Sequence, residues 1–214
     1  MASAVPKVNG ARSAARYVAF TPLPNFFQLD YLRRGNARQR RAYRVLAALD
    51  LWPALAPFGP VLAGTIPLGI DTAASDLDVI CQVAPADFIH FEHLLRTRYG
   101  GQPGFQVVLT QSRGRAAVVV RFTHEGLAIE IFGQDLPARA QYAVRHLLME
   151  ATVLRAGGAS WRAAVRQLKQ QGLKTEPAFA HLLDLAGDPY EALLTLESWS
   201  AAELRAWVRG RALL

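Results

Sequence analysis

The sequence predicts an α+β protein, in which a mixed β-sheet core of about five strands with helices is followed by an all-helical extension. Up to about residue 136, short apolar runs rich in β-branched residues lie between turn residues, as strands do. From residue 138 to residue 214, apolar residues recur at helical spacing between glycines and prolines. We therefore expect a loose N-terminal arm over 1–20, a mixed α/β core over 21–136 and a helical extension over 137–214 that packs on the core.

Each element of the core is expected from its own pattern. Asn36 is placed to cap a helix over 36–52, in which apolar residues recur at helical spacing. A second amphipathic helix is expected over 86–98. The strands are expected at 59–65 (with a break at Gly64), 77–83, 105–112, 116–123 and 127–133.

The extension is expected to contain several helical segments, because glycines and prolines interrupt its helical pattern. Thr175 is placed to cap the segment that follows Gly172, and Pro177 lies in the first turn of that segment. The segments are expected at 139–156, 160–171, 176–186, 189–196 and 200–210.

Composition bounds the class of protein and its partners. The 214 residues, 51% of them hydrophobic, are enough for one well-packed domain or for one domain with a helical extension. A formal charge of +7 indicates either an anionic partner, such as a nucleotide or a nucleic acid, or simply a basic solvent-facing surface. The single cysteine, Cys81, is typical of a reducing compartment, so we expect a cytoplasmic protein. No apolar run approaches the roughly 18 residues of a membrane span, and we expect no contact with a membrane.

Two aspartates open the apolar run 77–83. Because side chains two residues apart on a strand face the same way, Asp76 and Asp78 project together. Two carboxylates so close repel each other strongly at a site of low dielectric constant, unless they share a proton or bind a cation. Carboxylate oxygens suit Mg²⁺ or Mn²⁺, and these ions also bind substrate phosphates.

A third carboxylate lies inside a later strand. Leu127, Ile129 and Ile131 share one face of this strand, and Glu130 lies on the other face. A lone acid in an apolar strand needs a partner. If this strand lies beside the strand of the two aspartates, the three carboxylates converge into a metal site; the alternative partner is an arginine, for example Arg121.

A glycine and two hydroxyl side chains precede the aspartate pair. Gly64, at the end of a strand, lets backbone N–H groups approach a phosphate closely, and the hydroxyl of Thr65 adds a donor. Ser75, directly before the pair, is grouped with them as a substrate-binding residue.

The order of these motifs, LAGT followed by SDLDVI and a distant IEIF, resembles the nucleotidyltransferase fold of the DNA polymerase beta superfamily. The resemblance covers about residues 60–132. It departs from the usual pattern where Thr65 replaces a serine and where Glu130 replaces the commoner aspartate.

The resemblance implies a role for each of these residues. Asp76 and Asp78 would hold two divalent ions, and Glu130 would orient or activate an attacking hydroxyl. Gly64 and Thr65 would then hold a triphosphate.

A closer resemblance covers most of the chain and is to an uncharacterised bacterial family, domain of unknown function 4269, placed in the same superfamily. No activity comes with that family name, so the membership supports the fold more than the reaction. The segments that carry it are YLRRGNARQRRAY, LAGTIPLGIDTAASDLDVIC, QYAVRHLLMEATVL and LKQQGLKTEPAFAHLLDLAGDPYEALL.

Basic residues outside this constellation are candidate phosphate contacts. Arg38 and Arg41 share one helical face with Arg34, which would meet a triphosphate or an RNA backbone or else lie in solvent. Arg145 is a candidate phosphate clamp, and Lys174 precedes a helix from which it reaches an anionic substrate. His146 is four residues from Glu150, and we expect it to make a structural hydrogen bond.

These features favour a metal-dependent nucleotidyltransferase that uses Mg²⁺ or Mn²⁺. Such an enzyme moves a nucleoside monophosphate from a nucleoside triphosphate to a hydroxyl acceptor, which is a small molecule, an RNA or a protein. One alternative is a nucleotide- or RNA-binding module without turnover on the same fold. Another is a regulatory partner protein of the toxin–antitoxin kind. The sequence leaves the acceptor, the nucleotide base and the oligomeric state open.

Overall fold

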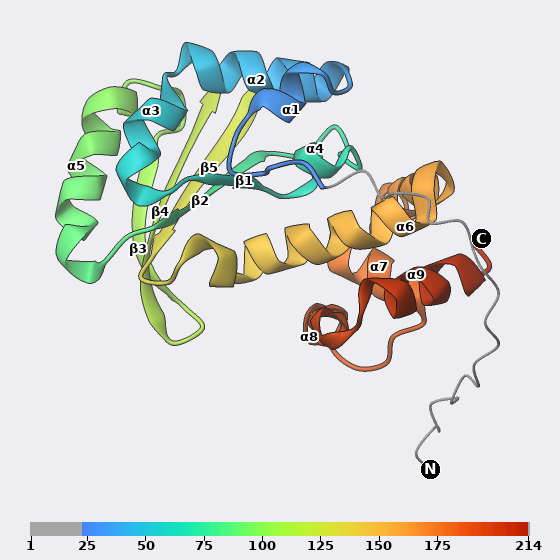
Figure 1. The fold of residues 1–214 in the computed structure, drawn as a ribbon. Helices are drawn as coiled ribbons and strands as arrows, with labels where there is room; N and C mark the ends of the chain where they lie inside the picture. Colours follow the sequence, from blue (N-terminus) through green and yellow to red (C-terminus); the bar gives the residue numbers. More distant parts are fainter. Residues whose placement is uncertain (1–22, 214) are drawn as a thin grey trace.

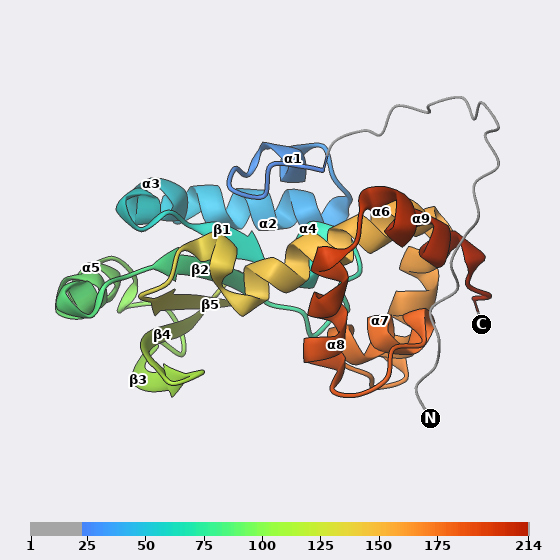
Figure 2. The same cartoon turned by 60° about the horizontal axis from the view of Figure 1, so that its bottom comes forward.

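The computed structural model describes residues 23–213, so the expected arm over 1–20 lies outside the described residues. A five-stranded mixed sheet carries helices on both faces, and a group of helices follows it at the C-terminal end of the chain (Figure 1). The second view shows α6 running along one face of the sheet, with α7, α8 and α9 gathered at its far end (Figure 2). The predicted α+β class, with about five strands and a helical C-terminal part, is confirmed.

The strand order places the last strand in the middle of the sheet. The order is β1-β2-β5-β4-β3; β2 and β5 are parallel and the other neighbours are antiparallel. β5 therefore pairs with β2 although 44 residues of chain lie between Gln82 and Leu127. The strands are β1 (Val61–Ala63), β2 (Leu77–Gln82), β3 (Gln106–Ser112), β4 (Arg115–His124) and β5 (Leu127–Gln134).

Two hydrophobic cores lie on the two faces of the sheet. The predicted apolar face of β5 packs under α2, α3 and α5, together with Leu77 and Val79 of β2. On the other face, Val61, Ala63 and Ile80 pack against α6 and the helices after it. Because side chains alternate along a strand, this division leaves Asp78 and Glu130 on the face of α6.

The helices agree with the expected pattern except at two boundaries. Asn36 caps α2 through a reciprocal pair of hydrogen bonds with Gln39, as predicted from its position. The helix expected over 36–52 is wrong at its end, because Asp50 adopts a left-handed conformation (φ 51°) and divides it into two helices. The N-terminal helices are α1 (Asp30–Arg33), α2 (Ala37–Ala48), α3 (Leu51–Leu55), α4 (Thr65–Leu68) and α5 (Phe88–Tyr99).

The C-terminal helices α7, α8 and α9 pack on α6, and α6 in turn packs on the sheet. Gly158 leaves helical geometry inside α6 (φ 73°, ψ −149°), which is the interruption expected between the first two segments. α7 begins at Thr175 itself, so the predicted cap is wrong by one residue and Lys174 holds the cap position. The helices are α6 (Tyr142–Gln170), α7 (Thr175–Leu183), α8 (Pro189–Thr195) and α9 (Ala201–Gly210).

Short 3-10 turns complete the chain, at η1 (Ala56–Phe58), η2 (Pro85–Asp87), η3 (Ala138–Ala140) and η4 (Leu196–Ser198). None of the helices between residues 23 and 213 combines the length and apolarity needed to cross a bilayer. The domain boundary at residue 136 stays a prediction.

Candidate active site

Asp78 and Glu130 lie side by side on neighbouring parallel strands. Asp78 is the second residue of β2 and is paired in register with Glu130 of β5. Asp76 directly precedes β2 by one residue, so the two aspartates flank Leu77, whose side chain is fully buried on the opposite face. The strand register thus brings the two acidic motifs, 52 residues apart in sequence, to one place.

Gly64 lies directly against the carboxylate of Asp78. Its backbone angles (φ 75°, ψ −158°) belong to a region that only glycine adopts readily. A Cβ atom at this position would overlap Asp78 Oδ2. The glycine at the end of β1 therefore allows the backbone to approach the acidic side chain, as it would a ligand in the same place.

The loop between β1 and β2 is held by its own hydroxyl groups. Thr65 Oγ1 and Ser75 Oγ are 2.9 Å apart, and the backbone N–H of Thr72 donates to Ser75 Oγ at 2.9 Å. Both hydroxyls that the sequence offered for substrate binding thus lie next to each other, and both take part in the loop's internal hydrogen bonds. Thr65 lines the cavity described below.

Two helices also fasten this loop from outside. Arg38 donates from Nη2 to the carbonyl oxygen of Ser75 at 2.9 Å and to that of Ala73 at 3.4 Å. Gln39 donates to the carbonyl oxygens of Ile66 and Pro67, and Arg166 of α6 donates to that of Gly69.

These contacts involve the helical face of Arg34, Arg38 and Arg41 that was predicted to meet phosphate. The guanidinium of Arg38 is engaged by the loop before Asp76, and that of Arg41 donates to the carbonyl oxygen of Glu125 in the β4–β5 turn. In this structure the two arginines hold turns of the chain, and neither side chain lines the cavity found within residues 23–213 beside Asp78.

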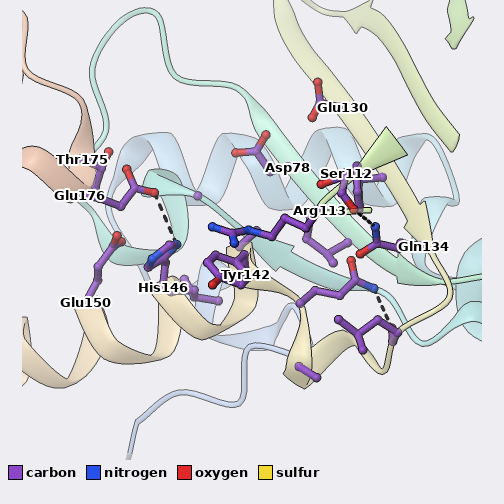
Figure 3. A pocket seen from close by; sticks show the side chains of 18 of the residues that line it. Asp78, Ser112, Arg113, Glu130, Gln134, Tyr142, His146, Glu150, Thr175 and Glu176 are labelled. Atoms are coloured by element: carbon purple, nitrogen blue, oxygen red, sulfur yellow. Dashed lines mark hydrogen bonds and ion pairs between the residues drawn. The ribbon is translucent and has the colours of Figure 1, made fainter. Parts of the chain in front are cut away.

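A cavity of about 620 Å³ opens between the sheet and helices α6 and α7 (Figure 3). Four of the sequence-predicted site residues line it: Gly64, Thr65, Asp78 and Glu130. The view shows Asp78 and Glu130 on one side, with Thr175 and Glu176 across from them. Further lining residues, absent from the predicted set, are Arg113, Arg115, Gln141, Tyr142, His146, Glu150, Thr175 and Glu176.

The charge around Asp78 is poorly compensated. Burial, followed by the negative charges of Asp76, Glu130 and Glu176, raises the pKa of Asp78 to about 7, while Lys169 acts in the opposite direction. The carboxylates are therefore close enough to repel one another, which is the condition under which a bound cation is most favourable.

Glu130 has an arginine partner. Arg121, its cross-strand neighbour on β4, approaches Glu130 Oε2 to 2.6 Å through Nη2 and 2.7 Å through Nε. This is the alternative partner that the sequence had left open. Over residues 23–213, no three His, Cys, Asp or Glu side chains stand close enough together to hold a metal ion.

The donor set fits a divalent ion in part. Asp76 and Asp78 offer hard oxygen ligands, and the charge of Asp78 is poorly compensated. The missing side chain of Gly64 lets the Asp78 carboxylate lie against the backbone. Both contacts with Arg121 fall on Oε2 of Glu130, so Glu130 can join the two aspartates through its other carboxylate oxygen, Oε1.

Two other predicted phosphate contacts lie elsewhere. Arg145 forms a two-pronged ion pair with Glu197, at 2.6 and 3.0 Å, so its guanidinium is already bound to a carboxylate. Lys174 is exposed at the start of α7.

Lys169 of α6, which the sequence analysis did not single out, lies among acidic residues. Burial lowers the pKa of its ammonium, whereas Glu150, Asp71, Glu176 and Asp76 raise it, so its charge lies among these carboxylates. Nothing in the sequence LKQQG marks it, because its position depends on how α6 crosses the sheet.

The β3–β4 turn reaches across the cavity mouth. Arg113, in the left-handed region (φ 51°), stacks its guanidinium 3.3 Å from the centre of the Tyr142 ring and donates to Glu191 at 2.7 Å. Tyr142 also donates to Glu191, at 2.9 Å. The sequence identified RGR only as a turn; the basic side chains beside its glycine were the available signal.

His146 makes a structural hydrogen bond, as expected. Its Nε2 lies 2.9 Å from the carbonyl oxygen of Tyr190. The pairing with Glu150 that its spacing suggested is not formed; instead, Nδ1 lies 3.8 Å from Glu176 Oε1.

A comparison with protein-family models assigns this chain to a family. The model described as Domain of unknown function (DUF4269) matches residues 44–196, and the chain belongs to this family. The match runs from α2 to the start of η4 and so includes both walls of the cavity. No curated protein matches the chain.

Three solved structures illustrate the similarity in fold. The Cid1 poly(U) polymerase with MgGTP bound has a TM-score of 0.48 and 12% identity, over 78% of this chain and 54% of that one. The GLD-2/RNP-8 complex has a TM-score of 0.49 and 11% identity, over 84% of this chain and 80% of that one. The polymerase core of TRAMP, an RNA surveillance complex, has a TM-score of 0.46 and 10% identity, over 84% of this chain and 59% of that one. The chain spans about half the length of the Cid1 chain that it matches.

Proposed function

We propose that the protein is a metal-dependent nucleotidyltransferase, which moves a nucleoside monophosphate from a nucleoside triphosphate to a hydroxyl acceptor. One observation carries the proposal: the half-buried Asp78 carboxylate lies against the Gly64 backbone and close to Asp76 and Glu130, with its pKa raised to about 7. A chain that keeps such unpaired charge at the edge of a cavity is arranged for a ligand that supplies positive charge.

Each residue has a role that its position supports. Asp76 and Asp78 would hold Mg²⁺ or Mn²⁺, which when bound stabilises the attacking and leaving oxygens. Gly64 and Thr65 line the cavity beside Asp78, where a backbone free of side chains admits phosphate oxygens. Glu130 takes the proton of the acceptor hydroxyl.

The reaction balances with these groups. The acceptor oxygen forms a bond to the α-phosphorus, and the bond from that phosphorus to the bridging oxygen of the β-phosphate breaks. The electron pair leaves with pyrophosphate, and the hydroxyl proton passes to Glu130.

Lys169 is the lysine whose surroundings suit the triphosphate. Its ammonium lies in the field of Asp76 and Glu150, whereas Lys174 is exposed on α7. We expect Lys169→Met to weaken binding of a nucleoside triphosphate and Lys174→Met to leave it nearly unchanged.

The test is transfer of label from α-labelled nucleoside triphosphates, offered singly with Mg²⁺ or Mn²⁺. The acceptors are a short RNA, a mixture of small hydroxyl compounds and the protein itself. We expect label transfer and pyrophosphate release by the wild type, and loss of both in Asp78→Asn. Asp184→Asn makes the same chemical change at an exposed carboxylate and serves as the control. Full turnover by Asp78→Asn would contradict the assignment.

The Arg121–Glu130 ion pair favours a second candidate function, a nucleotide- or RNA-binding module without turnover. In that case Glu130 stays bound to Arg121 and the phosphates meet basic side chains alone. Binding would then be independent of the metal and would fall steeply with salt, while no label is transferred.

A further inference from the structure

The two edges of the sheet differ in length and in exposure. β1, at one edge, has three residues, and all of them are buried. β3, at the opposite edge, has seven residues, and most of them are exposed. Figure 2 shows β3 as the outermost strand, and among residues 23–213 only β4 pairs with it. The roles proposed above make no use of this edge.

The turn after β3 determines which backbone groups point outward. Arg113 and Gly114 both have positive φ (51° and 74°) and join Ser112 to Arg115, as in the commonest two-residue hairpin turn. Ser112 and Arg115 are then a hydrogen-bonded pair, and such pairs alternate with non-bonded pairs along antiparallel strands. Among residues 23–213, no loop or further strand hydrogen-bonds to the groups that point away from β4. These are the N–H and C=O groups of Val107, Leu109 and Gln111.

The edge of β3 lacks the features by which proteins usually protect a free strand. Protected edge strands are short, or they carry charged residues or proline. β3 has the sequence QVVLTQS, with no charged residue and no proline. The apolar side chains of Val108 and Leu109 are 42% and 65% exposed. An uncharged, apolar edge of this length is suited to pairing with a further strand.

The symmetry of the edge indicates which strand fits it. A two-fold axis at Leu109 pairs this residue with its own copy, and Val107 with Gln111 of the other copy. Every outward N–H group then meets an outward carbonyl oxygen, because all three residues point away from β4. The antiparallel arrangement also keeps the two basic turns, each with Arg113, at opposite ends of the strand pair. Parallel pairing would bring these like charges together.

We propose that two copies of this protein associate by antiparallel pairing of β3 with β3, centred on Leu109, so that their sheets form one continuous sheet. The pairing also covers the exposed side chain of Leu109 with its copy. Two-fold symmetry closes the contact, and the short, buried β1 offers no comparable strand at the other edge. The expected assembly is therefore a dimer and not a filament. The inference is independent of the proposed function.

The test is sedimentation equilibrium of the full-length protein at concentrations from about 1 to about 100 μM. We expect the wild type to show twice the mass of one chain. Leu109→Lys should raise the dissociation constant of the dimer at least about tenfold, because like charges directly opposite each other destabilise a strand pair. Ile89→Lys adds the same charge at an apolar residue of α5 that is 83% exposed. It is the control and should leave the dimer unchanged.

A charge exchange separates loss of the contact from loss of the fold. Leu109→Lys and Leu109→Glu should each be monomeric alone, and their equimolar mixture should form a dimer, because opposite charges then meet at the axis. A monomeric wild type, which would leave the edge to a strand of a different protein, would overturn the proposal. So would an unchanged dimer in Leu109→Lys, equal dissociation by Ile89→Lys, or a mixture that stays monomeric.

Discussion

The two walls of the cavity hold their carboxylates by different means. On the sheet wall (Gly64, Thr65, Asp78 and Glu130), strand pairing sets the side chains and Arg121 already binds one of them. On the helical wall (His146, Glu150, Thr175 and Glu176), helix packing sets the side chains and Glu150 has no partner within residues 23–213. Arg121 thus neutralises part of the sheet wall, whereas no arginine of the described residues pairs with a carboxylate of the helical wall.

The difference in charge compensation between the two walls indicates which carboxylates lower the free energy of unfolding. Unpaired buried charge lowers the free energy of unfolding, and proteins keep it mainly where a ligand uses it. Burial raises the pKa of Asp78 on one wall and of Glu150 on the other, so ionising either carboxylate costs stability. Variants on each wall should therefore separate stability from binding.

The largest effect is expected for Asp78→Asn. Because the folded pKa of about 7 exceeds the ordinary value of 3.8, the folded chain keeps a proton that the unfolded chain loses between these pH values. The free energy of unfolding of the wild type should fall by up to about 4 kcal/mol as the pH rises from about 4 to about 8. Asp78→Asn lacks this dependence and should be the more stable protein at pH 8.

Urea unfolding at several pH values measures the difference. The two proteins should be alike below about pH 3, where both states of the wild type are protonated. A wild type that is as stable as Asp78→Asn at pH 8 would show that the carboxylate is compensated.

The next effect is expected at the glycine that supports the sheet wall. Gly64→Ala places a Cβ against Asp78 Oδ2 in a conformation reserved for glycine, and should cost about 2–3 kcal/mol of stability. Gly59→Ala is the matched control, because Gly59 also has a positive φ (57°) but a Cβ there meets nothing within 4 Å. Equal losses in denaturant unfolding would mean that contact with Asp78 is unimportant.

A smaller effect is expected when the loop before Asp76 is released. Arg38→Met removes the hydrogen bonds to the carbonyl oxygens of Ser75 and Ala73 and should cost about 1–2 kcal/mol. Arg41→Met removes a contact in the β4–β5 turn and should leave nucleotide affinity unchanged. If Arg41→Met weakens nucleotide binding, the arginine face binds phosphate directly.

The smallest effect is expected at Arg145. Arg145→Gln breaks a partly exposed ion pair with Glu197, which is worth about 1 kcal/mol or less. Because the guanidinium is already bound to that carboxylate, nucleotide affinity should not change. A large loss of affinity in a filter-binding assay would restore Arg145 as a phosphate contact.

The sheet wall could be predicted from the sequence because strands have a period of two. The alternation of Leu127, Ile129 and Ile131 placed Glu130 on the opposite face whatever its neighbours were. The β2–β5 pairing that joins Glu130 to Asp78 was an assumption, since register between distant strands depends on the whole sheet.

The helical wall could not be predicted in the same way. Which residues of α6 face the cavity depends on its path across the sheet, and no local pattern specifies that path. Lys169 and Glu150 therefore went unassigned, and Arg38 was expected to bind phosphate although its partners are two backbone carbonyls. Side chains that bind distant backbone leave no periodic signal in a sequence.

The central claim is that Asp76 and Asp78 bind a divalent cation, and melting temperature against Mg²⁺ concentration at pH 8 tests it most directly. A ligand that binds only the folded state raises the melting temperature by mass action. We expect the wild type and Asp184→Asn to gain stability as Mg²⁺ is added, and Asp78→Asn to begin higher and stay level. The same rise in the wild type and in Asp78→Asn would contradict the account.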